Sequence, residues 1–149
     1  MVDNKWDGLD EAMARMRNLA PGLVKKGLRA AARKGARVFM DAARAGARRI
    51  DDPESAADIA KNITIRESGK EGKKLQAIVM RVGVKGGARP NNNDPKDTGH
   101  WRHVEMGTSD TRAQPFMRPA IADNIDKATS AVVRELIPQI EKQIKKATK

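Results

Sequence analysis

The chain has 149 residues and a formal net charge of +11, with 33% charged residues, two Trp, two Phe, no Tyr and no Cys. This length predicts a single domain, residues 1–149, with a modest aliphatic core, and the lack of cysteine excludes a disulfide framework and a Cys-based zinc site. No stretch approaches the roughly 18 apolar residues of a membrane span, and the first residues lack the apolar core of a signal peptide. We therefore expect no membrane partner, and a protein that stays in a reducing cytoplasm until it enters a larger assembly.

Two helices are predicted in the N-terminal third of the chain. Apolar residues at steps of three and four favour an amphipathic helix over residues 3–19. They are Trp6, Leu9, Met13, Met16 and Leu19. Residues 22–50 predict a second helix with a stripe of mostly small residues, and because Gly costs about 1 kcal/mol relative to Ala inside a helix, Gly27, Gly35 and Gly46 indicate a closely packed helix or one that is firm only when packed.

The second predicted helix is also the most basic part of the chain. Residues 21–50 carry nine Lys or Arg residues and one acidic residue. The nine are Lys25, Lys26, Arg29, Arg33, Lys34, Arg37, Arg44, Arg48 and Arg49. Two interpretations stay open: contact with an anionic partner such as DNA or an acidic protein surface, or a solvated helix face that keeps the protein soluble.

The middle of the chain predicts a small sheet. Asp52 and Pro53 would begin a short helical turn over residues 53–61. Alternating apolar residues predict strands at 62–67 and 75–84, which a charged turn at 68–74 would join as a hairpin. Residues 86–99, rich in Gly, Pro and Asn, predict a mobile loop.

A third strand is expected at Trp101–Met106, where side chains alternate before Gly107 ends the segment. Pro119 would then be the first residue of a long helix over residues 119–147, with a frayed basic tail at 142–149. The predicted fold class is α+β: two N-terminal helices, a mainly antiparallel sheet of about three strands, and a long C-terminal helix packed on the sheet.

No catalytic or metal-binding template fits the sequence. Residues 69–74 are rich in Gly and Lys but lack the spacing of a phosphate-binding loop. On a strand, His100 and His103 would point to opposite faces, and Ser109, His103 and Asp110 have no surrounding nucleophile motif. We therefore expect no enzyme activity, no cofactor and no metal.

Glu105 and Arg118 suggest an ion pair that closes the loop between them. Such a pair would act either as an intrachain clamp, the more economical interpretation, or as a contact between subunits. Loss of Glu105 is therefore expected to impair folding or assembly.

Residues 100–120, HWRHVEMGTSDTRAQPFMRPA, carry a family resemblance. The Val-Glu-Met-Gly-Thr run, the short polar loop and the Gln-Pro-Phe-Met-Arg-Pro-Ala run resemble the signature of the neck or tail-completion proteins of long-tailed bacteriophages. Met106 stands where that family has an aromatic residue, and Trp101 opens a segment that is Tyr-rich in the family. The candidate fold or subunit contacts in this stretch are Trp101, Val104, Glu105, Gly107, Thr108, Pro115, Phe116, Arg118 and Pro119.

The resemblance implies a non-enzymatic virion protein of the head–tail junction, made in the host cytoplasm. Such a protein would form a homo-oligomeric ring, a hexamer that matches the symmetry of the tail, which completes the tail and joins it to the head connector. Its partners would be copies of itself, neighbouring connector and tail proteins, and the double-stranded DNA that passes through. Two alternatives stay open: a tail terminator that caps the tail tube, and a basic DNA-binding protein without sequence preference.

Overall fold

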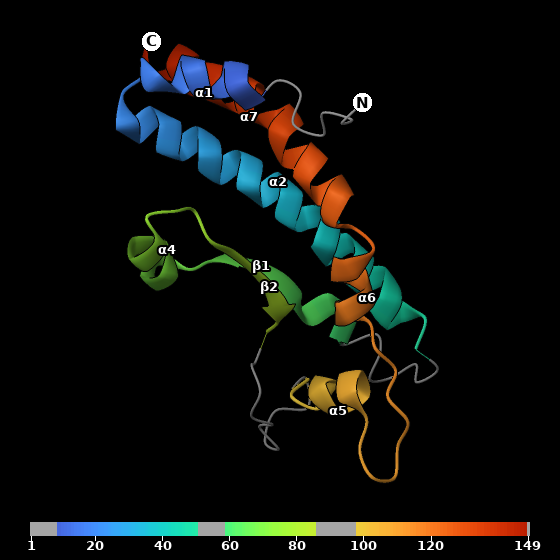
Figure 1. Cartoon of the computed structure of the whole chain (residues 1–149). Coiled ribbons are helices and arrows are strands. Elements are labelled where there is room, and N and C mark those ends of the chain that lie inside the picture. The colour runs from blue at the N-terminus through green and yellow to red at the C-terminus, as the bar shows by residue number, and fades with distance from the viewer. Residues whose placement is uncertain (1–8, 51–58, 86–97, 149) are drawn as a thin grey trace. The chain divides into compact units, whose positions relative to one another are not determined.

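The computed structural model describes residues 9–50, 59–85 and 98–148 (Figure 1). The chain divides into two compact units. The first unit contains Met1–Val38, Glu67–Met80 and Asp126–Lys149, and the second contains Phe39–Arg66 and Arg81–Ile125. The boundaries fall within continuous elements, so both long helices, Pro21–Arg48 and Ile125–Ala147, contribute residues to both units.

The described elements follow one another as helices and two strands, which makes the protein α+β. They are α1 (Leu9–Arg17), α2 (Pro21–Arg48), β1 (Ile63–Glu67), α4 (Gly69–Leu75), β2 (Met80–Val84), α5 (Trp101–Met106), α6 (Met117–Ala122) and α7 (Ile125–Ala147). Residues 59–62 are also helical and lead directly into β1. The rest of the helical turn predicted at 53–61, and residues 86–97 of the predicted loop, lie outside the described residues.

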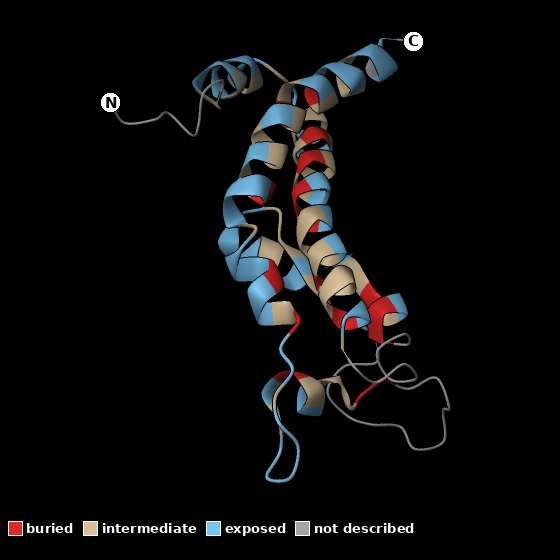
Figure 2. Ribbon diagram, turned by 90° about the vertical axis from the view of Figure 1, so that its right-hand side faces the viewer, coloured by how far each residue is buried: buried red, intermediate tan, exposed pale blue. Residues whose placement is uncertain are grey.

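The core of the first unit lies between α1, α2 and α7. Ala31, Leu136 and Ile140 are buried there. Partly buried apolar residues surround them: Leu9, Met16, Leu19, Leu28, Val132, Ile137 and Ile144. In Figure 2 the exposed positions lie on the outward sides of the helices and the buried ones on the sides that face a neighbour.

Two glycines of α2 explain how closely α7 approaches. A Cβ added at Gly27 would lie 2.7 Å from Cγ1 of Ile140, and one added at Gly35 would overlap Cγ2 of Val132. At these two positions, a side chain on α2 would collide with α7, so the close approach of the two helices depends on glycine. The tight packing predicted from these glycines is confirmed.

The C-terminal part of the chain forms two helices where the sequence predicted one. The turn at Asp123–Asn124 separates α6 from α7, and Asn124 Nδ2 donates a hydrogen bond to the carbonyl oxygen of Ala120 at 3.0 Å. α6 begins at Met117, so Pro119 is its third residue, where a missing N–H costs no helical hydrogen bond. α7 continues through Pro138 as far as Ala147, beyond the predicted start of fraying at Lys142.

Over residues 9–50, 59–85 and 98–148 the sheet has two strands, β1 and β2, and the prediction of about three strands is wrong. Lys85 N–H donates to the Asn62 carbonyl at 2.7 Å and Ser68 N–H donates to the Val79 carbonyl at 2.9 Å, which defines an antiparallel pair. The predicted second strand began at Leu75, but β2 begins at Met80. The predicted hairpin is otherwise present.

The connection between the strands is helix α4, where the sequence predicted only a charged turn. Gln76 ends this helix in the left-handed conformation (φ 49°), and its N–H donates to the carbonyl of Gly72. A residue in this conformation is a common helix terminator because it lets the chain turn while the last carbonyls keep partners.

The segment Trp101–Met106 is helix α5, and the prediction of a third strand there is wrong. Val104 N–H donates to the His100 carbonyl at 3.3 Å and Gly107 N–H to the His103 carbonyl at 2.8 Å. In a helix, residues three and four apart lie on one face. Trp101, Val104 and Glu105 therefore all turn inward, which an alternating strand would prevent.

The second unit has its own apolar core. Its buried residues are Ala43, Ala47, Ile59, Ala60, Ile63, Val84, Phe116 and Ala120. Thr98 is also buried, with 1% of its surface exposed, and its hydroxyl accepts a hydrogen bond from Asn62 Nδ2 at 3.1 Å. The last residues of the segment predicted as a mobile loop are thus packed in this core.

Candidate functional site

Glu105 is the most buried carboxylate among the described residues, with 3% of its surface exposed. Its Oε2 accepts hydrogen bonds from the backbone N–H groups of Phe116 at 2.7 Å and Met117 at 2.9 Å, and its Oε1 accepts one from the N–H of Arg118 at 3.0 Å. One side chain of α5 thus binds three consecutive backbone donors at the start of α6.

These hydrogen bonds make Glu105 a helix cap supplied from another element. The first N–H groups of a helix have no partner within the helix, and Phe116, the residue before α6, gives no side-chain cap of its own. A carboxylate also interacts favourably with the positive end of the helix dipole. Glu105 therefore fixes where α6 begins and how it is oriented against α5.

Arg118 closes the contact from the side of α6. Its Nε donates to Oε1 of Glu105 at 3.1 Å, and its Nη2 donates to the backbone carbonyl of Glu105 at 2.8 Å. The predicted Glu105–Arg118 pair is therefore present as an intrachain clamp. The guanidinium donates to one carboxylate oxygen and to the backbone carbonyl rather than to both carboxylate oxygens. The Arg118 side chain is 65% exposed.

The hydrogen bonds also set the ionisation of Glu105. Burial by itself would raise the pKa of this carboxyl, but the backbone N–H groups of Met117, Phe116 and Arg118, together with the Arg118 side chain, outweigh it. The pKa of Glu105 is thereby lowered. The carboxylate is ionised at neutral pH with its oxygens engaged by donors, which suits a structural role better than proton transfer.

The loop between α5 and α6 is built around Gly107 and Thr108. Gly107 has φ 76°, and a Cβ there would lie 2.7 Å from the nitrogen of Ala113, so only glycine fits. The Thr108 hydroxyl accepts hydrogen bonds from the N–H groups of Asp110 at 3.3 Å and Thr111 at 3.1 Å. The loop then returns to α5, because Gln114 N–H donates to the Val104 carbonyl at 2.8 Å.

Phe116 anchors this loop in the core of the second unit. Its ring meets that of Trp101 edge to face, with centroids 6.5 Å apart and an interplanar angle of 72°. Its Cβ would lie 3.1 Å from a Cβ added at Gly46, so the third glycine of α2 also marks a close approach. The guanidinium of Arg102 lies 5.9 Å from the centre of the Trp101 ring.

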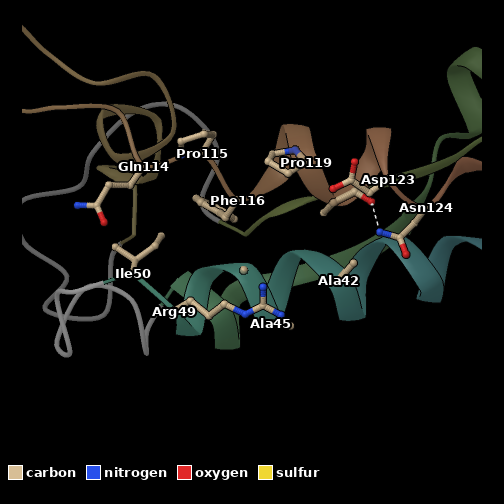
Figure 3. A pocket seen from close by; sticks show the side chains of 12 residues that line it. Ala42, Ala45, Arg49, Ile50, Gln114, Pro115, Phe116, Pro119, Asp123 and Asn124 are labelled. Atoms are coloured by element: carbon tan, nitrogen blue, oxygen red, sulfur yellow. Dashed lines mark hydrogen bonds between the residues drawn. The ribbon is translucent and has the colours of Figure 1, made fainter.

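A groove of about 520 Å³ runs between the end of α2 and α6 (Figure 3). We call it the α2–α6 groove. Small and apolar residues line most of it, and Phe116 separates the two helices. Its polar lining residues are Arg49, Gln114, Asp123 and Asn124.

The described residues offer no site for metal ligation or for the hydrolase considered above. No group of three or more His, Asp or Glu residues that could hold a metal ion occurs in the described part of the chain. Ser109 Oγ donates to Asp110 Oδ2 at 3.1 Å within an exposed loop, and His103 is exposed on α5. None of the helices described here has the length and apolar character needed to cross a membrane.

The nine basic residues of α2 divide between internal contacts and the surface. Arg29 pairs with Glu67 at 2.6 Å and Lys34 with Glu135 at 3.3 Å, both in the first unit. In the second unit Nη2 of Arg44 donates to the carbonyl of Ile63 at 2.8 Å, so this residue is part of the fold. The remaining members, Lys25, Lys26, Arg33, Arg37, Arg48 and Arg49, are exposed.

The sequence predicted Arg118 as the partner of Glu105, but the main partners of this carboxylate are backbone N–H groups. Every residue except proline carries an N–H, so the sequence does not show which of them lack a partner. A usable signal was present, because Trp101, Val104 and Glu105 have the three-and-four spacing of a helix face. That spacing would have placed Glu105 beside the aromatic core.

Together, the fold and this site define an α+β protein whose buried carboxylate network holds helices in place. The chain matches the HK97-gp10-like family, described as "Bacteriophage HK97-gp10, putative tail-component", over residues 10–107. It therefore belongs to this bacteriophage tail-component family, as the resemblance predicted. The match runs from the second residue of α1 to Gly107 and thus covers only the first eight residues, 100–107, of the motif at 100–120. No curated protein and no solved structure matches the chain.

Proposed function

We propose that the protein is a non-enzymatic structural component of the phage virion that forms a ring at the head–tail junction. The ring, a hexamer that matches the symmetry of the tail, completes the tail and joins it to the head connector around the DNA channel. Membership in a tail-component family supports the virion location.

The observation that carries this proposal is the network around Glu105. Its carboxylate and the Arg118 guanidinium are used to hold α5, the connecting loop and α6 in one arrangement. An enzyme would instead leave such a buried acid facing a space for substrate. A rigid loop and helix start is what repeated contact between identical subunits needs.

Large apolar side chains are exposed on α5, on α6 and at the start of α7. Met106 is 68% exposed, Ile121 47% and Ile125 53%, and all three belong to the second unit. Exposed apolar clusters often mark contacts between proteins. We assign Ile121 and Ile125 to the contact between copies of this chain. We assign Met106 to a separate contact surface of the second unit.

Electron microscopy of the purified full-length protein, alone and mixed with tails that lack it, tests this proposal. We expect the wild-type protein alone to form rings. We expect the tails mixed with it to become able to join heads. The variant Ile121→Asp/Ile125→Asp should stay monomeric and fail to join, because two charges would be buried at the contact. Leu75→Asp replaces a 63% exposed apolar residue of the first unit and serves as the matched control, with rings retained.

A wild type that neither forms rings nor restores joining would contradict the proposal. Rings that cap the end of an isolated tail tube without allowing heads to join would instead identify a tail terminator. The melting temperatures of both variants should stay near that of the wild type, since the substituted side chains are exposed.

A further inference from the structure

The first unit contains a hollow of about 270 Å³ on the surface of α2. Five of its lining residues are cations and the other two are Ala30 and Gln139. The cations are Lys26, Arg29, Arg33, Lys34 and Arg37. Among the described residues, no acidic side chain lines this hollow, which we call the cationic hollow.

Internal acids neutralise only part of this charge. Arg29 and Lys34 have their carboxylate partners, Glu67 and Glu135. Hydrogen bonding from Arg29 lowers the pKa of Glu67, with weaker help from Arg33 and Lys25 at longer range. In the described part of the chain, no acidic side chain lies within ion-pair distance of the other three cations, Lys26, Arg33 and Arg37.

Lys26, Arg33 and Arg37 form a straight row along one face of α2. They are separated by seven and four residues, so each lies close to the same angular position on the helix. The eleven residue steps from Lys26 to Arg37 cover about 16 Å of helix axis, which equals about five phosphates along one strand of duplex DNA. Ala30, between them, leaves room for a ligand to approach the helix.

We propose that the cationic hollow binds the phosphate backbone of double-stranded DNA, with Lys26, Arg33 and Arg37 each contacting a phosphate within this span of one strand. Arginine suits this because its guanidinium can donate two hydrogen bonds to one phosphate. The contact is independent of sequence, since phosphates carry no base information. The inference rests on the proposed function, because a protein at the head–tail junction surrounds DNA.

The composition of the hollow favours DNA over an acidic protein as the occupant. The core of a protein interface normally contains large apolar or aromatic side chains, and the described residues that line the hollow include none. The described residues of the first unit also include no aromatic residue, which argues against single-stranded DNA, whose bases stack on aromatic rings. Cations alone are sufficient for the duplex backbone.

Binding of the full-length protein to a 40-base-pair duplex of arbitrary sequence, measured by fluorescence anisotropy from 50 to 200 mM salt, tests this inference. Three phosphate contacts predict that wild-type affinity falls at least about 40-fold over this range. The variant Lys26→Gln/Arg33→Gln/Arg37→Gln should bind at least about tenfold more weakly at 50 mM salt and lose most of the salt dependence.

The matched control is Lys70→Gln/Lys73→Gln/Lys74→Gln, which removes the same charge from exposed lysines of α4 in the same unit. It should bind DNA within about threefold of the wild type. Equal loss in both variants, or no binding by the wild type at 50 mM salt, would overturn the inference.

Head–tail joining, measured on the same samples, separates this inference from the proposed function. If the hollow variant binds DNA as well as the wild type but no longer joins heads to tails, the inference of a DNA contact is overturned. The occupant of the hollow would then be an acidic protein surface. A wild type that joins tails to heads but does not bind DNA leaves the proposed function intact and removes only the DNA contact.

Discussion

The two units of this protein are stabilised in different ways. In the first, α2 and α7 meet at glycines where no side chain fits, and the ion pairs lie at the surface: Arg15 and Glu141, 3.0 Å apart, are each about half exposed. In the second, a buried carboxylate binds backbone donors across a loop. Close packing at glycines therefore holds α2 against α7 in the first unit, whereas a buried polar network fixes α5 and α6 in the second.

The largest expected effect comes from removing the polar network. Glu105→Ala leaves the N–H groups of Phe116, Met117 and Arg118 without their acceptor, and we expect the free energy of unfolding to fall by about 2–4 kcal/mol. Chemical denaturation followed by circular dichroism measures it. The same change at Glu141, whose ion pair is half exposed, should cost less than about 1 kcal/mol. Equal costs at the two sites would remove the distinction between the units.

A smaller effect is expected from the steric contact in the first unit. Gly35→Ala would force a Cβ against Val132 and 3.1 Å from the Ala128 carbonyl oxygen. Overpacking outweighs the higher helix propensity of Ala, so we expect a net loss of about 1–2 kcal/mol. Gly22→Ala on the same helix meets nothing within 4 Å and should be neutral or stabilising by up to about 1 kcal/mol. Thermal melting of both variants checks this, and a stabilised Gly35→Ala protein would show that the helices do not need the close approach.

The smallest effect concerns pH and the ionisation of Glu105. The pKa of Glu105 is lowered in the folded state from the ordinary value of 4.5. Ionised Glu105 therefore contributes its full share to the free energy of unfolding above pH 4.5, and this contribution is lost as the pH falls through the folded-state pKa. Glu105→Gln should lower the free energy of unfolding by about 1 kcal/mol at pH 6. This difference in stability between the variant and the wild type, the gap, should narrow as the pH is lowered to 3. Urea denaturation at several pH values measures this gap. A constant gap would mean that ionisation of Glu105 contributes nothing to the second unit.

The sequence by itself determined the long helix α2 and its tight packing. Its 28 residues carry one stripe of small residues at helical spacing, which favours a long helix. Gly27, Gly35 and Gly46 mark the places where another element comes close. It also determined the hairpin β1–β2, the Glu105–Arg118 pair and the tail-component family. These features rest on periodicity, residue type or a motif, all of which can be read along the chain.

Only the tertiary structure decided the state of the short segments. Residues 101–106 alternate well enough for a strand, and 69–75 contain two glycines, yet both are helices. A segment of six or seven residues has little conformational preference of its own, because helix nucleation costs more than so few hydrogen bonds return. Its state is therefore set by what it contacts: Glu105 is buried only because α5 places it beside the first N–H groups of α6.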